Sequence, residues 1–405
     1  MKKYDFDKQI ERRGTDCIKW DALLSMYGRE DLTPMWVADM DFASPDFVIE
    51  AIKRRCDHPV LGYTMPSDGY WRAVSGWLER HYDITTTEET LHFIPGIVSG
   101  ISYVLLALTA PGDRVLVTTP VYPPFLNLPR ASGRELVVSP LKIEGGRFEI
   151  DFDDFERKVA GCKLFIMSNP HNPGGTIWGS EVLRRIADIC EEEGVLVISD
   201  EIHADLTLFP SLSCRSGEWP EERPERPVQV SYSTVSRVAE RHSITFMAPS
   251  KTFNIAGLGS SVCYIPDEEL RSRFFSWLDS LGVAGGNIFA FTAAEAAFSQ
   301  GEEWLSEMLG YLKHNVELLE GFLSRQLPKV KYVLPEASYL AWLDFSAYGI
   351  PHKELAYRLL NEARVVLNDG TTFGGEAYSY CFRINLGCPS GVLLDVLERI
   401  HKLFL

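Results

Sequence analysis

The 405-residue sequence contains no run of about eighteen uninterrupted apolar residues, the length that a helix needs to cross a bilayer. Its opening residues, MKKYDFDKQIERRGTD, lack the apolar core of a secretory signal. Positive charge is also scarce, because 40 Lys and Arg stand against 56 Asp and Glu, a formal net charge of −16. We therefore expect a cytoplasmic protein whose main partner is neither nucleic acid nor a membrane surface.

The eight cysteines are scattered and form no Cys-x-x-Cys pair. This usage is typical of buried thiols in a reducing compartment, and it favours neither a disulfide framework nor a zinc site. The sequence has no internal repeat, and its one biased stretch, residues 217–227 (GEWPEERPERP), indicates an exposed loop. The fractions of hydrophobic (45%) and charged (24%) residues are ordinary, so a large core is expected.

Short apolar, β-branched runs alternate with helical patterns in the middle of the chain. The predicted strands are residues 92–94, 114–118, 135–139, 162–168, 195–199, 243–247 and 261–265. Such alternation predicts an α/β fold, in which a mostly parallel, doubly wound sheet is covered by helices on both faces. Ligands of these folds bind at the carboxyl ends of the strands.

The pattern changes after Pro266 to long helices and a few short strands, which predicts a smaller α+β domain. We predict an N-terminal arm that forms part of the small domain (1–45), a large domain (46–285) and a C-terminal small domain (286–405). Residues 33–45, TPMWVADMDFASP, are too apolar for a free loop. They form either an extended arm packed on another surface or an ordinary core strand.

Lys251 follows the predicted strand 243–247, where the strand gives way to a glycine-containing turn. A lysine amine beside apolar residues loses hydration, so its pKa falls and it can form a Schiff base with a carbonyl. Taken alone, a lysine in such a position is most often an ordinary surface residue, so the interpretation of Lys251 depends on the residues around it.

Asp200 ends the strand 195–199 within the motif SDEIHADL, where an acid can bind a protonated ring nitrogen. His203, three residues later, is within reach of the same ligand. The alternative is that Asp200, Glu201, His203 and Asp205 are solvated loop residues, and a metal site is the least favoured interpretation.

Three further stretches follow predicted strand ends. Asn172 in SNPHNPGGT lies in a rigid turn, where its amide either contacts a ligand hydroxyl or is merely structural. Gly96, Ile97 and Val98 open a helix, and backbone N–H groups at a helix start bind phosphate. Tyr122 either lays its ring on a planar ligand or packs in the core.

Arg383 lies in a short apolar strand of the smaller domain, and its guanidinium needs a carboxylate, from a substrate or from a structural ion pair. Together these residues describe one ligand, with a phosphate at Gly96–Val98 and Ser250, a flat ring, a protonated ring nitrogen, a phenolic oxygen and an aldehyde. That ligand is pyridoxal phosphate, and Arg383 is then placed to bind the carboxylate of an amino acid, a small-molecule substrate.

The motifs NPHNPGG, SDEIHADL, APSKTFNIAGL and FRINLGCP occur in this order. Over nearly the whole chain they resemble the class I and II aminotransferase group of fold-type I pyridoxal-phosphate enzymes. The stretches MWVADMDF, GYT, SDEIH and APSKTFNIAGL are more specific. They resemble the cystathionine β-lyase, or cysteine-S-conjugate β-lyase, branch of the MalY/PatB type.

The resemblance implies a role for each matched residue at the cofactor. Lys251 is the Schiff-base lysine, Asp200 is the partner of the pyridinium nitrogen, and Tyr122 is the stacking ring. Asn172 and His203 are the neighbours of the ring oxygen.

The resemblance also implies how substrate and a second subunit take part. Arg383, with Val37 and Ala38, binds the substrate carboxylate. Tyr63 resembles the tyrosine that reaches the phosphate bound by the other subunit, which makes the enzyme a homodimer with shared active sites.

Three positions depart from the aspartate-aminotransferase pattern. His203 replaces a tyrosine, Ala248 a phosphate-binding serine, and Gly259 a phosphate-binding arginine. Phosphate binding must then depend more on backbone N–H groups, Ser250 and Tyr63, which makes classical transamination less favoured.

The resemblance implies a lyase that removes a thiolate from Cβ of cystathionine or a related cysteine S-conjugate, leaving pyruvate and ammonia. The alternatives are an aminotransferase and, least favoured, a regulatory protein that retains the fold. No helix pair of the DNA-binding kind precedes the domain, which argues against a fused transcription factor.

Overall fold

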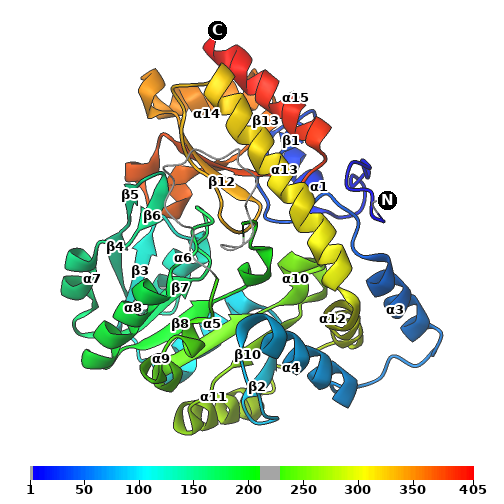
Figure 1. The fold of residues 1–405 in the computed structure, drawn as a ribbon, viewed down its shortest axis with the longest axis vertical. Coiled ribbons are helices and arrows are strands. Elements are labelled where there is room, and N and C mark those ends of the chain that lie inside the picture. The colour runs from blue at the N-terminus through cyan, green and yellow to red at the C-terminus, as the bar shows by residue number, and fades with distance from the viewer. Residues whose placement is uncertain (1–2, 210–228) are drawn as a thin grey trace.

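The computed structural model describes residues 3–209 and 229–405, in two regions that the long helix α13 (Glu302–Gln326) joins (Figure 1). The predicted loop 217–227 lies outside the described residues. None of the helices within these two ranges is long and apolar enough to cross a membrane.

A seven-stranded sheet forms the centre of the larger region, in the order β2-β10-β9-β8-β7-β3-β4. Its strands are β2 (Leu91–Ile94), β3 (Arg114–Thr119), β4 (Glu135–Pro140), β7 (Cys162–Ser168), β8 (Leu196–Asp200), β9 (Ser243–Met247) and β10 (Ser261–Tyr264). Only β10 runs antiparallel to its neighbours in this sheet. All seven predicted strands are present, and the α/β prediction is confirmed.

Helices cover both faces of this sheet (Figure 1). On one face, α5 (Ile97–Leu108), α6 (Pro123–Ala131) and α11 (Glu268–Leu281) bury side chains such as Ile101 and Phe274 against the strands. On the other face, α7 (Phe152–Val159), α8 (Ser180–Glu192) and α9 (Arg237–His242) do the same. This is a doubly wound arrangement, in which inner strands such as β8 and β9 are largely buried because helices cover both sides.

The smaller region is built on an antiparallel sheet of order β11-β12-β15-β14. Its strands are β11 (Lys331–Val333), β12 (Leu340–Asp344), β14 (Asn368–Asp369) and β15 (Cys381–Asn385). The helices α13 (Glu302–Gln326), α14 (His352–Asn361) and α15 (Ser390–His401) pack in the same core. The α+β prediction for this part agrees with these elements, while the boundaries 45/46 and 285/286 stay a prediction.

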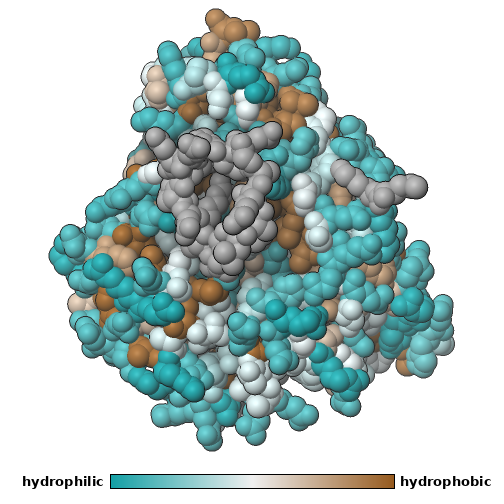
Figure 2. Space-filling model, viewed as in Figure 1, coloured by the Kyte–Doolittle hydropathy of each residue, from teal (hydrophilic) through white to brown (hydrophobic). Residues whose placement is uncertain are grey.

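The remaining elements are short or lie at the side of the large sheet. They are α1 (Ile18–Asp21), α2 (Leu23–Tyr27), α3 (Asp46–Cys56), α4 (Asp68–Tyr82), α10 (Pro249–Thr252), α12 (Ile288–Gln300), the pair β1 (Thr33–Pro34) and β13 (Val365–Val366), and the hairpin β5 (Lys142–Glu144) and β6 (Arg147–Glu149). The surface in Figure 2 is mostly hydrophilic, with small separate hydrophobic patches.

Residues 33–45 form an extended arm rather than a core strand. Only Thr33 and Pro34 are in strand conformation, and they pair with β13 of the smaller region. Met35, Met40 and Phe42 are buried in the core that this region shares with α3, α4 and α12. The arm therefore brings its backbone to the boundary between the two sheets.

Candidate active site

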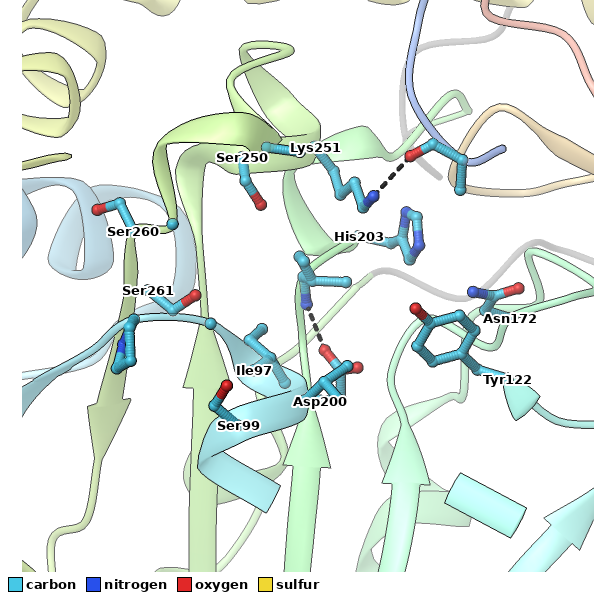
Figure 3. Close-up of a pocket in the computed structure, with 17 residues that line it drawn as sticks. Ile97, Ser99, Tyr122, Asn172, Asp200, His203, Ser250, Lys251, Ser260 and Ser261 are labelled. Atoms are coloured by element: carbon cyan, nitrogen blue, oxygen red, sulfur yellow. Dashed lines mark hydrogen bonds between the residues drawn. The ribbon is translucent and has the colours of Figure 1, made fainter. Parts of the chain in front are cut away.

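A cavity of about 200 Å³ opens where the carboxyl ends of the large sheet's strands meet (Figure 3). Because β10 is antiparallel to β2 and β9, its first residue, Ser261, pairs with Ile94, the last residue of β2. The cavity is lined by Ala38, Pro95, Gly96, Ile97, Val98, Ser99, Tyr122, Asn172, Asp200, Ile202, His203, Ser250, Lys251, Ala256, Gly259, Ser260 and Ser261. Nine of the residues predicted to bind the cofactor thus meet in one place, although their roles stay a prediction.

Lys251 lies in α10, a single helical turn that begins directly after β9 with Pro249 at its first position. Proline is favoured there because the N–H group that it lacks would have no partner within the first turn of a helix. The Lys251 ammonium donates a hydrogen bond to the Ala38 carbonyl at 2.6 Å. Burial lowers the pKa of Lys251 to about 8, with Asp39 opposing the shift and Arg383 adding to it. An amine with this pKa is available as a nucleophile or base near neutral pH.

Asp200 is the last residue of β8, and 6% of its surface is exposed. Its carboxylate accepts a hydrogen bond from the Ile202 N–H at 3.1 Å. Burial raises the pKa of Asp200 to about 7, although this hydrogen bond and the charge of Lys251 partly oppose the shift. A buried carboxylate with so little local compensation has an energetic need for a cationic partner.

Glu201 and His203 in the motif SDEIHADL are buried and Asp205 is half-buried, so the solvated-loop alternative is wrong. Glu201 is 2% exposed and accepts hydrogen bonds from the Ser199 hydroxyl and the Tyr232 N–H, both at 2.8 Å. Asp205 accepts hydrogen bonds from Trp77 Nε1 at 2.9 Å and from Thr252 Oγ1 at 2.7 Å. These acids hold the loops around the cavity.

The start of α5 forms one end of the cavity, with Gly96, Ile97, Val98 and Ser99 in its lining. The first N–H groups of a helix have no partner within the helix and attract anions. Ser250, Ser260 and Ser261 line the same cavity. This end has the chemistry of a phosphate site built from N–H and hydroxyl groups.

Gly259 explains one departure from the aspartate-aminotransferase pattern. Its φ of +62° lies in the left-handed region, and a Cβ on it would lie 2.9 Å from the Pro95 carbonyl oxygen. An arginine at this position would strain the backbone and push against the turn that leads into α5.

Arg383, on β15 of the smaller region, contacts Asn172 in the cavity wall and is 4% exposed. Its Nη1 donates to Asn172 Oδ1 at 2.9 Å, and its Nη2 donates to the Trp36 carbonyl at 2.9 Å and to Asn368 Oδ1 at 2.5 Å. Its Nε is buried with no partner among the described residues. Because these partners are neutral, the guanidinium retains its charge for an incoming carboxylate.

The arm residues Val37 and Ala38 are held by their own backbone. The carbonyl groups of residues 36–39 all accept hydrogen bonds: the first from Arg383, the second and fourth from Asn385 Nδ2 at 2.6 and 2.7 Å, and the third from Lys251 and from the Tyr339 hydroxyl at 3.0 Å. The arm is thereby fixed between the substrate-side arginine and the lysine.

Tyr63 lies away from the cavity. Its side chain is fully exposed, in the segment between α3 and α4, and Val60, Leu61 and Met65 of this segment are exposed too. In one chain, therefore, Tyr63 does not join the other predicted residues.

Sequence reasoning missed several residues that shape the cavity. Ser99, Ser260 and Ser261 belong to no recognisable motif, although Ser261 opens a predicted strand. Asn385 lies two residues after Arg383, on the same face of β15, and this spacing was an available signal. Tyr339 reaches the arm only through the tertiary fold.

The residues present fit pyridoxal phosphate. The partly compensated Asp200 carboxylate suits a protonated ring nitrogen, the start of α5 suits a phosphate, and Lys251 offers an amine with a lowered pKa. Within residues 3–209 and 229–405 there is no cluster of His, Cys, Asp and Glu side chains that could hold a metal ion.

Comparison with known proteins gives consistent matches. The family model for aminotransferase class I and II matches residues 31–400. Cystathionine beta-lyase PatB of Bacillus subtilis is 42% identical over 400 residues, 98% of each chain. Cystalysin from Treponema denticola, whose structure contains pyridoxal 5′-phosphate, is 30% identical with a TM-score of 0.90, over 99% of this chain and 98% of that one. The pyridoxal-phosphate-bound C–S lyase from Staphylococcus hominis is 33% identical with a TM-score of 0.86, over 98% and 97%.

Proposed function

Because the chain belongs to the aminotransferase class I and II family, we propose that it is a pyridoxal-phosphate-dependent carbon–sulfur β-lyase. Its substrate is cystathionine or a related cysteine S-conjugate, and its products are a thiol, pyruvate and ammonia. The observation that carries the proposal is that Lys251 and Asp200 line one cavity, while Arg383 contacts Asn172 in the wall of that cavity. The full-length similarity to proteins named as C–S lyases supports the reaction class.

The cofactor, when bound, supplies an aldehyde that links to an amine and a protonated ring that withdraws electrons from the substrate Cα. Asp200 keeps the ring nitrogen protonated, because its own buried charge is stabilised only beside a cation. Tyr122 and Ile202 lie along the cavity wall, and Gly96, Ile97, Val98 and Ser250 hold the phosphate. Asn172 and His203, which line the same cavity, would hold the ring oxygen.

Lys251 moves the proton. Its amine, with a pKa of about 8, removes the Cα proton of the bound amino acid, and the thiolate then leaves from Cβ. The Ala38 carbonyl, 2.6 Å from Nζ, keeps the amine on the arm side of the cavity. Arg383 binds the substrate carboxylate beside the backbone of Val37 and Ala38, which orients the Cα–H bond.

A second subunit completes the site. Tyr63 and its exposed apolar neighbours Val60, Leu61 and Met65 lie on a segment that a second copy of the chain would cover. In the homodimer Tyr63 reaches the phosphate of the other subunit and adds to the backbone donors there. The enzyme acts in the cytoplasm, and its substrate is a small-molecule amino acid.

The experiment that tests the reaction class is incubation of the purified protein, loaded with pyridoxal phosphate, with cystathionine and without a 2-oxo acid. We expect pyruvate, ammonia and thiol in equal amounts. Turnover that requires an added 2-oxo acid, with no pyruvate formed in its absence, would instead make the protein an aminotransferase.

A further inference from the structure

His203 lines the cavity and faces the smaller region with its other side (Figure 3). Its Nδ1 lies 3.1 Å from the hydroxyl of Ser338, and its ring meets the ring of Tyr339 edge-on at 6.1 Å. Burial, with a contribution from the charges of Lys251 and Arg383, lowers the pKa of His203 to about 3. The imidazole is therefore neutral and carries one proton, on one of its two nitrogens.

The Ser338 hydroxyl determines which nitrogen carries that proton. Ser338 is 1% exposed, and its backbone N–H already donates to the Leu206 carbonyl at 2.8 Å. Among the residues that the structure describes, His203 Nδ1 is the one hydrogen-bond partner of the Ser338 hydroxyl. A buried hydroxyl proton without an acceptor is costly, so the hydroxyl donates and Nδ1 accepts.

The backbone of Ser338 is a second, independent sign that its side chain matters. Its φ of +73° lies in the left-handed region, where a residue with a side chain costs about 1–2 kcal/mol. Glycine would adopt this conformation freely but would bring no hydroxyl. Strained residues that persist near a ligand site commonly serve that site.

The strand-like contacts around Ser338 hold it in place against this strain. Ala337 pairs with Thr207 in an isolated bridge, and the N–H groups of Glu336 and Ala337 both donate to the Gly175 carbonyl, at 3.0 and 2.9 Å. The segment that carries Ser338 is therefore fixed to the loop that directly follows His203.

We infer that Ser338 is a positioning residue that holds His203 as the Nε2–H tautomer. The imidazole ring is thereby a hydrogen-bond donor toward the cavity. Asn172 is oriented in the same way, because its Oδ1 accepts from Arg383 and its amide Nδ2 is left for the cavity. Two neutral donors on neighbouring loops suit one anionic oxygen. This inference rests on the proposed function, in which that oxygen is the phenolic oxygen of the cofactor ring.

Two variants distinguish the effect of the Ser338 hydroxyl from the effect of the backbone strain at this position. Ser338→Ala removes the hydroxyl and keeps a side chain at positive φ, whereas Ser338→Gly removes the hydroxyl and relieves the strain. The glycine variant should therefore unfold at a higher temperature than the alanine variant. If the hydroxyl positions His203, both variants should nevertheless bind pyridoxal phosphate about fivefold more weakly than wild type, since one net hydrogen bond contributes about 1 kcal/mol.

The tautomer itself is read by ¹⁵N NMR of histidine-labelled apo-protein, with His203→Gln to assign the signal. We expect the proton on Nε2 in wild type and a mixture of tautomers in both variants. In the loaded protein, the pH midpoint of the cofactor's visible absorbance should rise equally in both variants, because the oxygen loses a donor that shares its negative charge.

A wild-type proton on Nδ1 would overturn the inference, and so would cofactor affinities that follow the thermal stabilities of the two variants. The NMR measurement uses apo-protein, so its result does not depend on whether the proposed function is correct. A protein that binds no pyridoxal phosphate would refute the proposed function and leave the tautomer result standing.

Discussion

The substitution Asp200→Asn should stabilise the folded apo-protein, although it removes a residue of the candidate active site. Burial raises the pKa of Asp200 from 3.8 to about 7, and each tenfold difference in proton affinity between the folded and unfolded states is equivalent to about 1.36 kcal/mol. Carrying the charged carboxylate therefore costs the folded apo-protein up to about 4 kcal/mol above pH 7. Water in the open cavity screens the charge, so this figure is an upper limit.

The direction in which stability changes with pH follows from proton binding. Between pH 4 and pH 7 the folded protein keeps a proton on Asp200 that the unfolded chain has already released, so stability falls as the pH rises through this window. Asparagine has no such dependence. Apo-protein with Asp200→Asn should be more stable than wild type. The difference between their free energies of unfolding should increase by about 3 kcal/mol between pH 5 and pH 8.

The assay is urea unfolding of both apo-proteins across this pH range, with the exposed Asp57→Asn as a control for removing a carboxylate. Loaded protein should behave in the opposite way. Loss of a charge-assisted hydrogen bond of roughly 1.5–3 kcal/mol should weaken cofactor binding about 10- to 100-fold, with little turnover left. A difference in free energy of unfolding that does not change with pH would refute the claim that the buried Asp200 charge destabilises the apo-protein. An apo-variant that is less stable than wild type at pH 8 would refute it too.

Two further substitutions test the two ends of the site. Gly259→Ala should weaken cofactor binding as well as stability, because its Cβ meets the Pro95 carbonyl, whereas Gly282→Ala, with a φ of +61° and open space around it, should lose only about 1–2 kcal/mol of stability. Equal cofactor affinity in both, measured by titration of the absorbance, would contradict the close approach at Pro95. Arg383→Lys should lower kcat/KM for cystathionine about 30- to 100-fold through KM, because lysine offers no planar fork and loses the bonds to Asn172 and Asn368. An unchanged KM in steady-state kinetics would exclude Arg383 from carboxylate binding.

The large sheet was predictable because each buried strand carries its own apolar, β-branched run, and a polar residue such as Asp200 follows where the run ends. The two-residue strands β1 and β13 were not predicted, because they pair only when residues more than 300 positions apart come together. The same reason explains the residues behind the site. Ser338 contacts His203 across 135 positions and Asn385 contacts Val37 across 348, so no local pattern identifies these contacts, although its spacing from Arg383 places Asn385 on the same face of β15.

The prediction for the arm 33–45 shows how far composition alone reaches. Its apolar side chains and prolines indicated packing, and Met35, Met40 and Phe42 are indeed buried. Composition did not indicate that its carbonyl groups bind Arg383, Asn385 and Lys251, because backbone acceptors are the same in every sequence.

The central claim is a covalent link between Lys251 and pyridoxal phosphate. Its most direct test is borohydride reduction of the loaded protein, followed by peptide mass mapping, with Lys251→Ala as the control. We predict one cofactor per chain, on the peptide that contains Lys251, and none in the control, which should also be colourless and inactive. A wild-type protein in which borohydride fixes no cofactor, or fixes it on another lysine, would contradict the account.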